Sequence, residues 1–109
     1  YALGCVAYWL LSARPVFRAP SAVGLLLKHA SEAPPRLTSP VASIPVALEA
    51  IVMRCLEKDP AHRPADARAI ERSLEQLGIG QLWSDMEATE WWNVHRPATA
   101  PVPVRATPV

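Results

Sequence analysis

Residues 1–11 form an apolar stretch, broken only by Gly4, and nothing before them could cap a helix. A helix that is apolar on all sides is normally a buried core helix. The stretch is too short to span a bilayer, which takes about 20 residues. It is also a poor secretory signal, because no basic residue precedes it and Arg14 and Pro15 follow it. We therefore expect a core helix at 1–12. We also expect the chain to be the last part of something longer, since complete domains rarely begin inside their most hydrophobic element.

The composition fits one small domain. The 109 residues are too few for two domains, and a hydrophobic fraction of 50% excludes a wholly disordered chain. A net charge of +1 gives little support for a nucleic-acid binder, which usually presents a basic face. We expect Cys5 and Cys55 to be buried thiols in a reducing compartment rather than a disulfide. They show no zinc-ligand spacing with His29, His62 and His95.

Hydrophobic spacing predicts four or five helices and no convincing strand. After the first helix, a second begins at the N-cap Ser21 and runs to about residue 30. A third spans 46–57, and a fourth runs from an entry at Pro64 to about residue 77, where Gly78 stops it. The apolar positions that share a face in these three helices are Val23, Leu26, Leu27 and Ala30; Leu48, Ile51, Val52, Cys55 and Leu56; and Ala67, Ile70, Leu74 and Leu77. We expect the last of these sets to face inward.

Two short signals mark turns and helix starts elsewhere. Asp59-Pro60 predicts a turn, because the carboxylate can accept hydrogen bonds from backbone N–H groups two or three residues on and proline presets the following φ. Ser84 and Glu87 form the pattern of a capping box, which predicts a fifth helix at about 85–94.

Two segments of the chain resemble conserved parts of a protein kinase. One is YALG at residues 1–4 with RPVF at 14–17, which resembles the central hydrophobic helix of the large lobe and its exit loop. The other is CLEKDPAHRP at residues 55–64, which resembles the last conserved motif of that lobe. The spacing between the two agrees with the family. The resemblance covers residues 1–77 and is closest to bacterial serine/threonine kinases of the eukaryotic type.

The resemblance implies an all-α fold, the helical C-terminal subdomain of a kinase large lobe, with four or five helices and a disordered tail. We expect residues 1–77 to be the end of a kinase domain truncated at its N-terminus. Residues 78–96 would be a short tryptophan-containing helical extension, and residues 97–109 a disordered proline-rich linker. The full-length enzyme would use ATP and Mg²⁺ to phosphorylate serine and threonine of protein substrates. We expect a cytoplasmic location, no nucleic-acid partner and no membrane span in this segment. Its first partner would be the missing N-terminal part of the kinase domain.

The resemblance assigns structural roles to a set of motif residues, which are Gly4, Val6, Leu10, Asp59, Pro60, Arg63 and Pro64. Val6 and Leu10 match residues that support the adenine-side spine, and as spine or plain core they are expected to be buried. Arg63 matches the arginine that pairs with the glutamate closing the activation segment. That glutamate would lie before residue 1, so we expect Arg63 to point to water or to pair with Asp59. Ala13 stands where the family usually has glycine, and a left-handed conformation there costs alanine about 1 kcal/mol.

The same resemblance implies which groups this stretch lacks. Phosphoryl transfer needs a glycine-rich loop, a lysine on the phosphates, an aspartate near the substrate hydroxyl and an Asp/Asn pair on magnesium. The four glycines, at 4, 24, 78 and 80, form no such loop, and Pro64 replaces the aspartate that would follow His62-Arg63 in a catalytic loop. We expect no catalytic, cofactor-binding or metal-binding residue here. The alternative function is a kinase-derived helical module that binds a partner without chemistry.

Tryptophans gather near the end of the chain. We expect the helix at 85–94 to fold back through Trp91 or Trp92 onto the last large-lobe helices, because exposed tryptophans are costly. The alternative is an exposed partner site.

Overall fold

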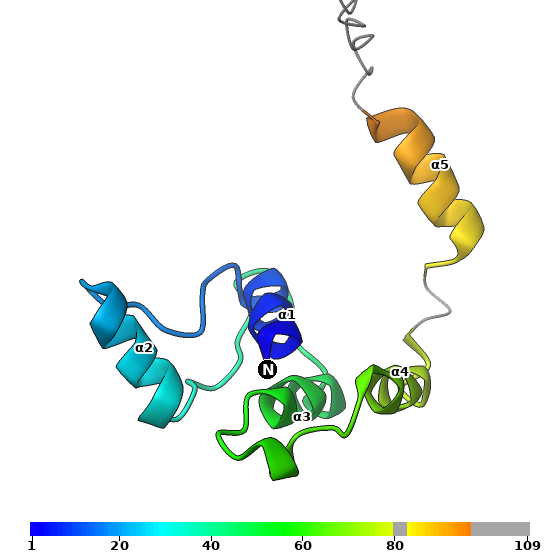
Figure 1. The fold of residues 1–109 in the computed structure, drawn as a ribbon. Helices are drawn as coiled ribbons and strands as arrows, with labels where there is room; N and C mark the ends of the chain where they lie inside the picture. Colours follow the sequence, from blue (N-terminus) through cyan, green and yellow to red (C-terminus); the bar gives the residue numbers. More distant parts are fainter. Residues whose placement is uncertain (80–82, 97–109) are drawn as a thin grey trace, which may run out of the picture. The chain divides into compact units, whose positions relative to one another are not determined.

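The computed structural model describes residues 1–79 and 83–96. Its regular structure is helical throughout the described residues, and it contains α1 (Ala2–Ser12), α2 (Ala22–Ser31), α3 (Val46–Cys55), a 3₁₀ turn at Pro60–His62, α4 (Ala67–Glu75) and α5 (Asp85–His95) (Figure 1). The predicted all-α fold is thus confirmed, with helix ends within about three residues of those expected. The largest difference is at α4, which begins at Ala67 rather than at the expected entry Pro64. The predicted linker at 97–109 lies outside the described residues.

The chain divides into two compact units, Tyr1–Ile79 and Gly80–Val109. The first unit holds α1 to α4, with α1 packed on α3 and α3 on α4. The described part of the second unit is α5 and the residues next to it. The predicted docking of α5 onto the large-lobe helices through its tryptophans stays a prediction.

The core of the first unit lies between α1, α3 and the segments that connect the helices. Its buried members are Tyr8, Val16, Phe17, Leu37, Val52 and Leu56. Half of these come from loops: Val16 and Phe17 follow α1, and Leu37 lies between α2 and α3. Helical periodicity finds only the positions on helices, so it did not indicate the loop residues.

The contact between α1 and α3 depends on Gly4. A Cβ atom at this position would come within 2.7 Å of the Cβ of Cys55 and 3.1 Å of a methyl carbon of Leu56. Real Cβ atoms essentially never approach so closely, so only glycine lets the two helices lie at this separation. Cys55 is buried and Cys5 is half-buried, and both are free thiols, as expected. Burial raises the pKa of each thiol above its ordinary value.

α1 is buried on one stripe only, through Gly4, Tyr8 and Ser12. Val6 and Leu10, which the resemblance assigns to the adenine-side spine, are 50% and 69% exposed among the described residues. They lie on the side of α1 away from this buried stripe. A helix that is apolar all round needs cover on every side, and the described residues cover only this one stripe of α1.

α2 departs from the usual amphipathic arrangement. It begins, as predicted, at the N-cap Ser21, whose hydroxyl accepts from the Gly24 N–H at 3.0 Å. Its apolar stripe, however, points to solvent: Val23, Leu26 and Leu27 are all more than 60% exposed. The half-buried positions on the other side include Leu25, Lys28 and His29. Leu25 packs against the core and His29 contacts Tyr1 and Phe17, and these contacts, rather than the apolar stripe, orient the helix.

Two helix boundaries have specific local causes. α1 ends at Ala13, which has φ 58° and ψ 21° and donates its N–H to the Trp9 carbonyl at 2.8 Å. Ala13 thus adopts the left-handed conformation that glycine would adopt at less cost. α4 begins at Ala67, after the N-cap Asp66, whose carboxylate accepts from the Ala69 N–H at 2.7 Å. This cap was not foreseen, and Ala67 itself is exposed rather than inward-facing, because it occupies the first turn beside the cap.

Candidate functional site

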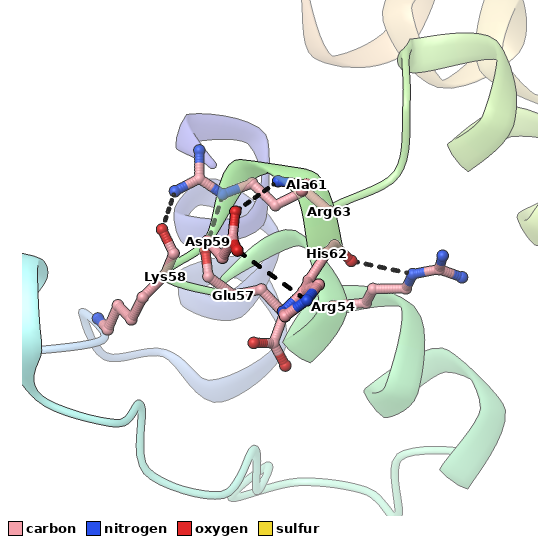
Figure 2. Close-up of polar contacts among 7 residues, drawn as sticks. All are labelled: Arg54, Glu57, Lys58, Asp59, Ala61, His62 and Arg63. Carbon is pink, nitrogen blue, oxygen red and sulfur yellow. Dashed lines mark hydrogen bonds and ion pairs between the residues drawn. The ribbon is translucent and has the colours of Figure 1, made fainter.

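The segment that resembles the last kinase motif folds as a tight turn between α3 and α4. Asp59 caps the 3₁₀ turn: its carboxylate accepts from the Ala61 N–H at 2.9 Å, and its carbonyl accepts from the His62 N–H at 3.1 Å. Pro60 supplies the first residue of the turn, and the Arg63 N–H closes it on the Pro60 carbonyl at 3.2 Å. The predicted Asp-Pro turn is confirmed, and its role is to present the side chain of Arg63 (Figure 2).

Arg63 is held by backbone carbonyls rather than by an acid. Its Nε donates to the Glu57 carbonyl at 2.7 Å and its Nη2 donates to the Lys58 carbonyl at 3.1 Å (Figure 2). Its guanidinium carbon also lies 4.9 Å from the centre of the Tyr1 ring. The expected pairing with Asp59 is wrong, because that carboxylate caps its own turn and lies 4.0 Å from His62.

These contacts order the guanidinium but leave some of its N–H groups without an acceptor in the described part of the chain. Carbonyl oxygens satisfy two of the nitrogens without neutralising the positive charge. Nη1 has no hydrogen-bond partner among residues 1–79 and 83–96. The side chain of Arg63 is thus half-buried, positively charged and fixed in place.

Tyr1 lies at the centre of a cluster that joins α1, α2 and the turn. Its ring has Arg63 at 4.9 Å and the Lys58 ammonium at 5.7 Å, and its hydroxyl is hydrogen-bonded to His29 Nδ1 at 2.8 Å. Burial raises the pKa of the Tyr1 hydroxyl; Cys5 raises it further and Arg63 opposes the rise. Cations over an aromatic face are each worth about 0.5–1 kcal/mol or more. The ring therefore helps to hold two cations near one another.

Lys58 and His29 complete this cluster. Lys58 Nζ donates to the His29 carbonyl at 2.9 Å and lies 4.8 Å from the centre of the Phe17 ring. The His29 ring meets the Phe17 ring edge-on, with centroids 5.0 Å apart. Sequence reasoning considered His29 only as a metal ligand and did not single out Lys58. The spacing of some 28 residues between the partners left no local signal for the contact.

A small apolar groove lies between α1, α3 and α4. Its volume is about 250 Å³, and the residues that line it include Leu3, Leu10, Leu48, Ile51, Ile70 and Leu74. The groove continues the exposed side of α1. It contains no polar side chain that could orient a small polar ligand, so it fits an apolar surface better than a metabolite.

The other residues that the kinase resemblance singled out occupy structural positions. Gly4 is a packing residue, Pro60 is part of the turn, and Pro64 lies just beyond it without belonging to a helix. No three metal-ligating side chains lie grouped together in the described ranges. Within those same ranges, no helix is both long and apolar enough to cross a membrane.

On α5 the aromatic side chains contact one another. Trp91 stacks on His95 at 4.3 Å between ring centroids and meets Trp92 edge-on at 4.9 Å. The predicted capping box is confirmed: the Glu87 N–H donates to the Ser84 hydroxyl, and the Ser84 N–H donates to the Glu87 carboxylate at 2.6 Å.

Comparison of the sequence with known proteins identifies relatives of this chain. The chain is 42% identical to serine/threonine-protein kinase pkn3 of Myxococcus xanthus over 79 residues, which is 71% of this chain and 14% of that protein. It is 36% identical to PrkC of Bacillus subtilis over 75 residues, 69% of this chain and 12% of that one. PknB of Mycobacterium tuberculosis matches 94% of the chain at 28% identity, across 18% of its own length. The chain thus spans less than a fifth of these curated relatives. No family model matches it.

Proposed function

Because the chain is homologous to bacterial serine/threonine protein kinases, we propose that residues 1–77 complete the large lobe of such an enzyme. They would form the C-terminal part of its kinase domain. The complete enzyme transfers the γ-phosphoryl group of ATP to serine or threonine side chains of protein substrates. The contribution of this segment is structural: it supplies the α1–α3 core and the turn that presents Arg63.

The observation that carries the proposal is the ordered guanidinium of Arg63. Two carbonyls and the Tyr1 ring fix its plane, while Nη1 and the net charge remain available within the described part of the chain. A carboxylate approaching this site meets a donor group that is already oriented, which is what makes arginine–carboxylate pairs strong. By the resemblance, that carboxylate belongs to the glutamate at the end of the activation segment.

The exposed side of α1 supports the same proposal. Leu3, Val6 and Leu10 are half or more exposed, and Leu3 and Leu10 line the apolar groove. Fully burying one such side chain is worth about 1.5–3 kcal/mol. The rest of the lobe gains this free energy by covering α1, and the covered helix then becomes the central pillar that the resemblance describes.

We further propose that this segment alone neither binds ATP nor transfers phosphate. The residues present do not fit a nucleotide–magnesium site: the sequence has no glycine-rich loop, and Pro64 follows His62-Arg63 where a catalytic loop has aspartate. The isolated chain should therefore show no rise in melting temperature with Mg-ATP, since a ligand that binds the folded state must stabilise it. A nucleotide-dependent rise contradicts this part of the proposal.

A chimeric enzyme tests the main part. Residues 1–79 replace the matching residues in the kinase domain of the Myxococcus xanthus relative, and phosphorylation of a general protein substrate is measured with Mg-ATP. We expect an active chimera. Arg63→Ala should lower activity roughly tenfold or more, because breaking a buried ion pair costs several kcal/mol. Arg54→Ala is the matched control, since this exposed arginine binds only the His62 carbonyl in the same turn. It should change activity less than about twofold.

Two outcomes would overturn the proposal. An inactive chimera that retains a folded helical spectrum favours the alternative, a non-catalytic helical interaction module. An active chimera in which Arg63→Ala and Arg54→Ala behave alike removes the role assigned to Arg63.

A further inference from the structure

One contact joins the end of α1 to the long segment between α2 and α3. The Arg14 guanidinium donates through Nη2 to the Thr38 hydroxyl oxygen at 2.6 Å. The two residues are 24 positions apart, and neither belongs to the Tyr1 cluster. Arg14 opens the RPVF segment that resembles the kinase exit loop, whereas Thr38 lies in neither kinase-like segment. A short bond from a charged donor to a neutral hydroxyl leaves most of the donor's capacity for a stronger acceptor.

Both partners stand on backbone that buried neighbours hold in place. The Arg14 N–H donates to the Ser12 hydroxyl at 3.3 Å, and that hydroxyl donates to the Tyr8 carbonyl at 2.6 Å. Ser12 is buried, and Ala13 between them is in the left-handed conformation. On the other side, Leu37 is buried in the core directly before Thr38. The exposed side chains of Arg14 and Thr38 are therefore brought together by the fold rather than by chance flexibility.

Thr38 and Ser43 are the exposed hydroxyl side chains of the segment between α2 and α3, and of the two it is Thr38 that contacts an arginine. The segment at 33–45 has no regular secondary structure, which suits entry into an enzyme active site. The neighbouring Ser39 hydroxyl accepts from the Val41 N–H at 3.3 Å and so is turned toward its own backbone. An open hollow of about 330 Å³ lies beside Thr38.

The charges around Thr38 also favour an added anion. Arg36 and Thr38 are both exposed while Leu37 between them is buried, so the two lie on the same side of an extended segment. Arg36 is paired with Glu49 at 3.2 Å. An anion on Thr38 would thus form an ion pair with Arg14 and would compete with Glu49 for an ion pair with Arg36.

We propose that Thr38 is a phosphorylation site and that Arg14 binds the resulting phosphate. A protein kinase acting in trans with Mg-ATP supplies the group. The Thr38 oxygen forms a bond to the γ-phosphorus as the bond from that phosphorus to the β–γ bridging oxygen breaks; ADP leaves with the electron pair, and the hydroxyl proton passes to the kinase's base. The product carries a charge of about −1.5 to −2 at neutral pH, with a second pKa near 6. Held against Arg14, it fastens the 33–45 segment to the exit of α1.

The direct test places phosphothreonine at position 38 of the full chain during translation. The second pKa of the phosphate is then followed by ³¹P NMR and compared with that of a short phosphothreonine peptide. We expect it to be lower in the chain by roughly half a unit or more, because an adjacent cation favours the dianion. Arg14→Gln should remove the difference. Arg18→Gln, a change at another exposed arginine of the same connection, should leave it intact.

The location of the modification is tested by mass spectrometry of the protein isolated from the cells that produce it. A phosphopeptide modified at Thr38 is expected, and its absence, or phosphate only on Ser39 or Ser43, overturns the proposal. An equal second pKa in the Arg14→Gln and unchanged chains, both with the helical spectrum of the unmodified protein, overturns the role of Arg14.

Discussion

The helix pair α1–α3 and the helix α5 are stabilised by opposite means. α1 and α3 interlock through Gly4 and bury Tyr8 and Leu56, yet neither has a side-chain N-cap. α5 begins with a complete capping box and buries none of its residues within its own unit. Where two helices share a core, caps are dispensable. Where a helix of only 11 residues has no core, local hydrogen bonds must supply its order.

The largest effect is expected from Leu56→Ala. Leu56 has an exposed fraction of 0%, so truncation leaves a cavity and should lower the free energy of unfolding by about 2–5 kcal/mol. Leu26→Ala is the control, because Leu26 is 69% exposed on α2 and its loss should cost less than about 0.5 kcal/mol. Urea titration followed by circular dichroism measures both. Similar losses in the two variants would show that the α1–α3 core does not dominate stability.

A smaller effect is expected from Gly4→Ala. The added methyl group meets the Cys55 Cβ at 2.7 Å, so α1 and α3 must move apart. Overpacking of this kind costs about 1–3 kcal/mol, against the roughly 1 kcal/mol by which alanine favours an exposed helix. Ala2→Gly, at the exposed start of the same helix, is the matched control and should cost about 1 kcal/mol or less. Stabilisation by Gly4→Ala would mean that the close approach does not constrain the pair.

On the other side of the comparison, Ser84→Ala should unwind the start of α5. Removing an N-cap hydroxyl costs about 1 kcal/mol of helix stability, and with no buried side chain in its unit α5 has little to offset the loss. Hydrogen exchange should become faster at the amides of 86–90. Exchange at the amides of α1 and α3 is the reference, and an increase there equal to that in α5 would show that the effect of the substitution is not local to the start of α5.

The smallest expected effect is on the pH dependence of α5. Two hydrogen bonds lower the pKa of the Glu87 carboxyl. The larger contribution comes from the Ser84 N–H and the smaller from the Ser84 hydroxyl. A lowered pKa in the folded helix means that the carboxylate stabilises α5 above its unfolded pKa. That stabilisation is lost as the pH falls through the folded pKa. Helicity of α5 should therefore decline on acidification, and in Glu87→Gln this part of the decline should disappear. If the variant loses helicity on acidification as the unchanged chain does, the decline is caused by other titratable groups.

Signals that act within a few residues could be predicted from the sequence. Ser21, Asp59 and Ser84 each cap the helix or turn that their neighbours predicted, and Ala13 adopts the left-handed conformation. Each of these depends on hydrogen bonds that reach no more than about four residues along the chain. Their outcome is therefore largely independent of the rest of the fold.

Two of the failures required knowledge of what lies across the fold. The stripe of α2 that includes Leu26 looks like a core face, but the side opposite it contacts the rest of the unit. Val6 and Leu10 are apolar and exposed, because the described residues cover only one stripe of α1. Arg63 finds carbonyls and Tyr1 rather than the acid nearest in sequence, since the carboxylate of Asp59 is engaged within its own turn.

The two thiols of the α1–α3 pair differ in how readily they are oxidised. Cys55 is buried and Cys5 half-buried, and a thiol whose pKa is raised by burial reacts slowly with oxidants and alkylating agents. Reaction at Cys55 must therefore wait for α1 to separate from α3, whereas Cys5 reacts first. Under conditions in which each separation is short, the modified fraction of Cys55 measures the accumulated time that the two helices have spent apart.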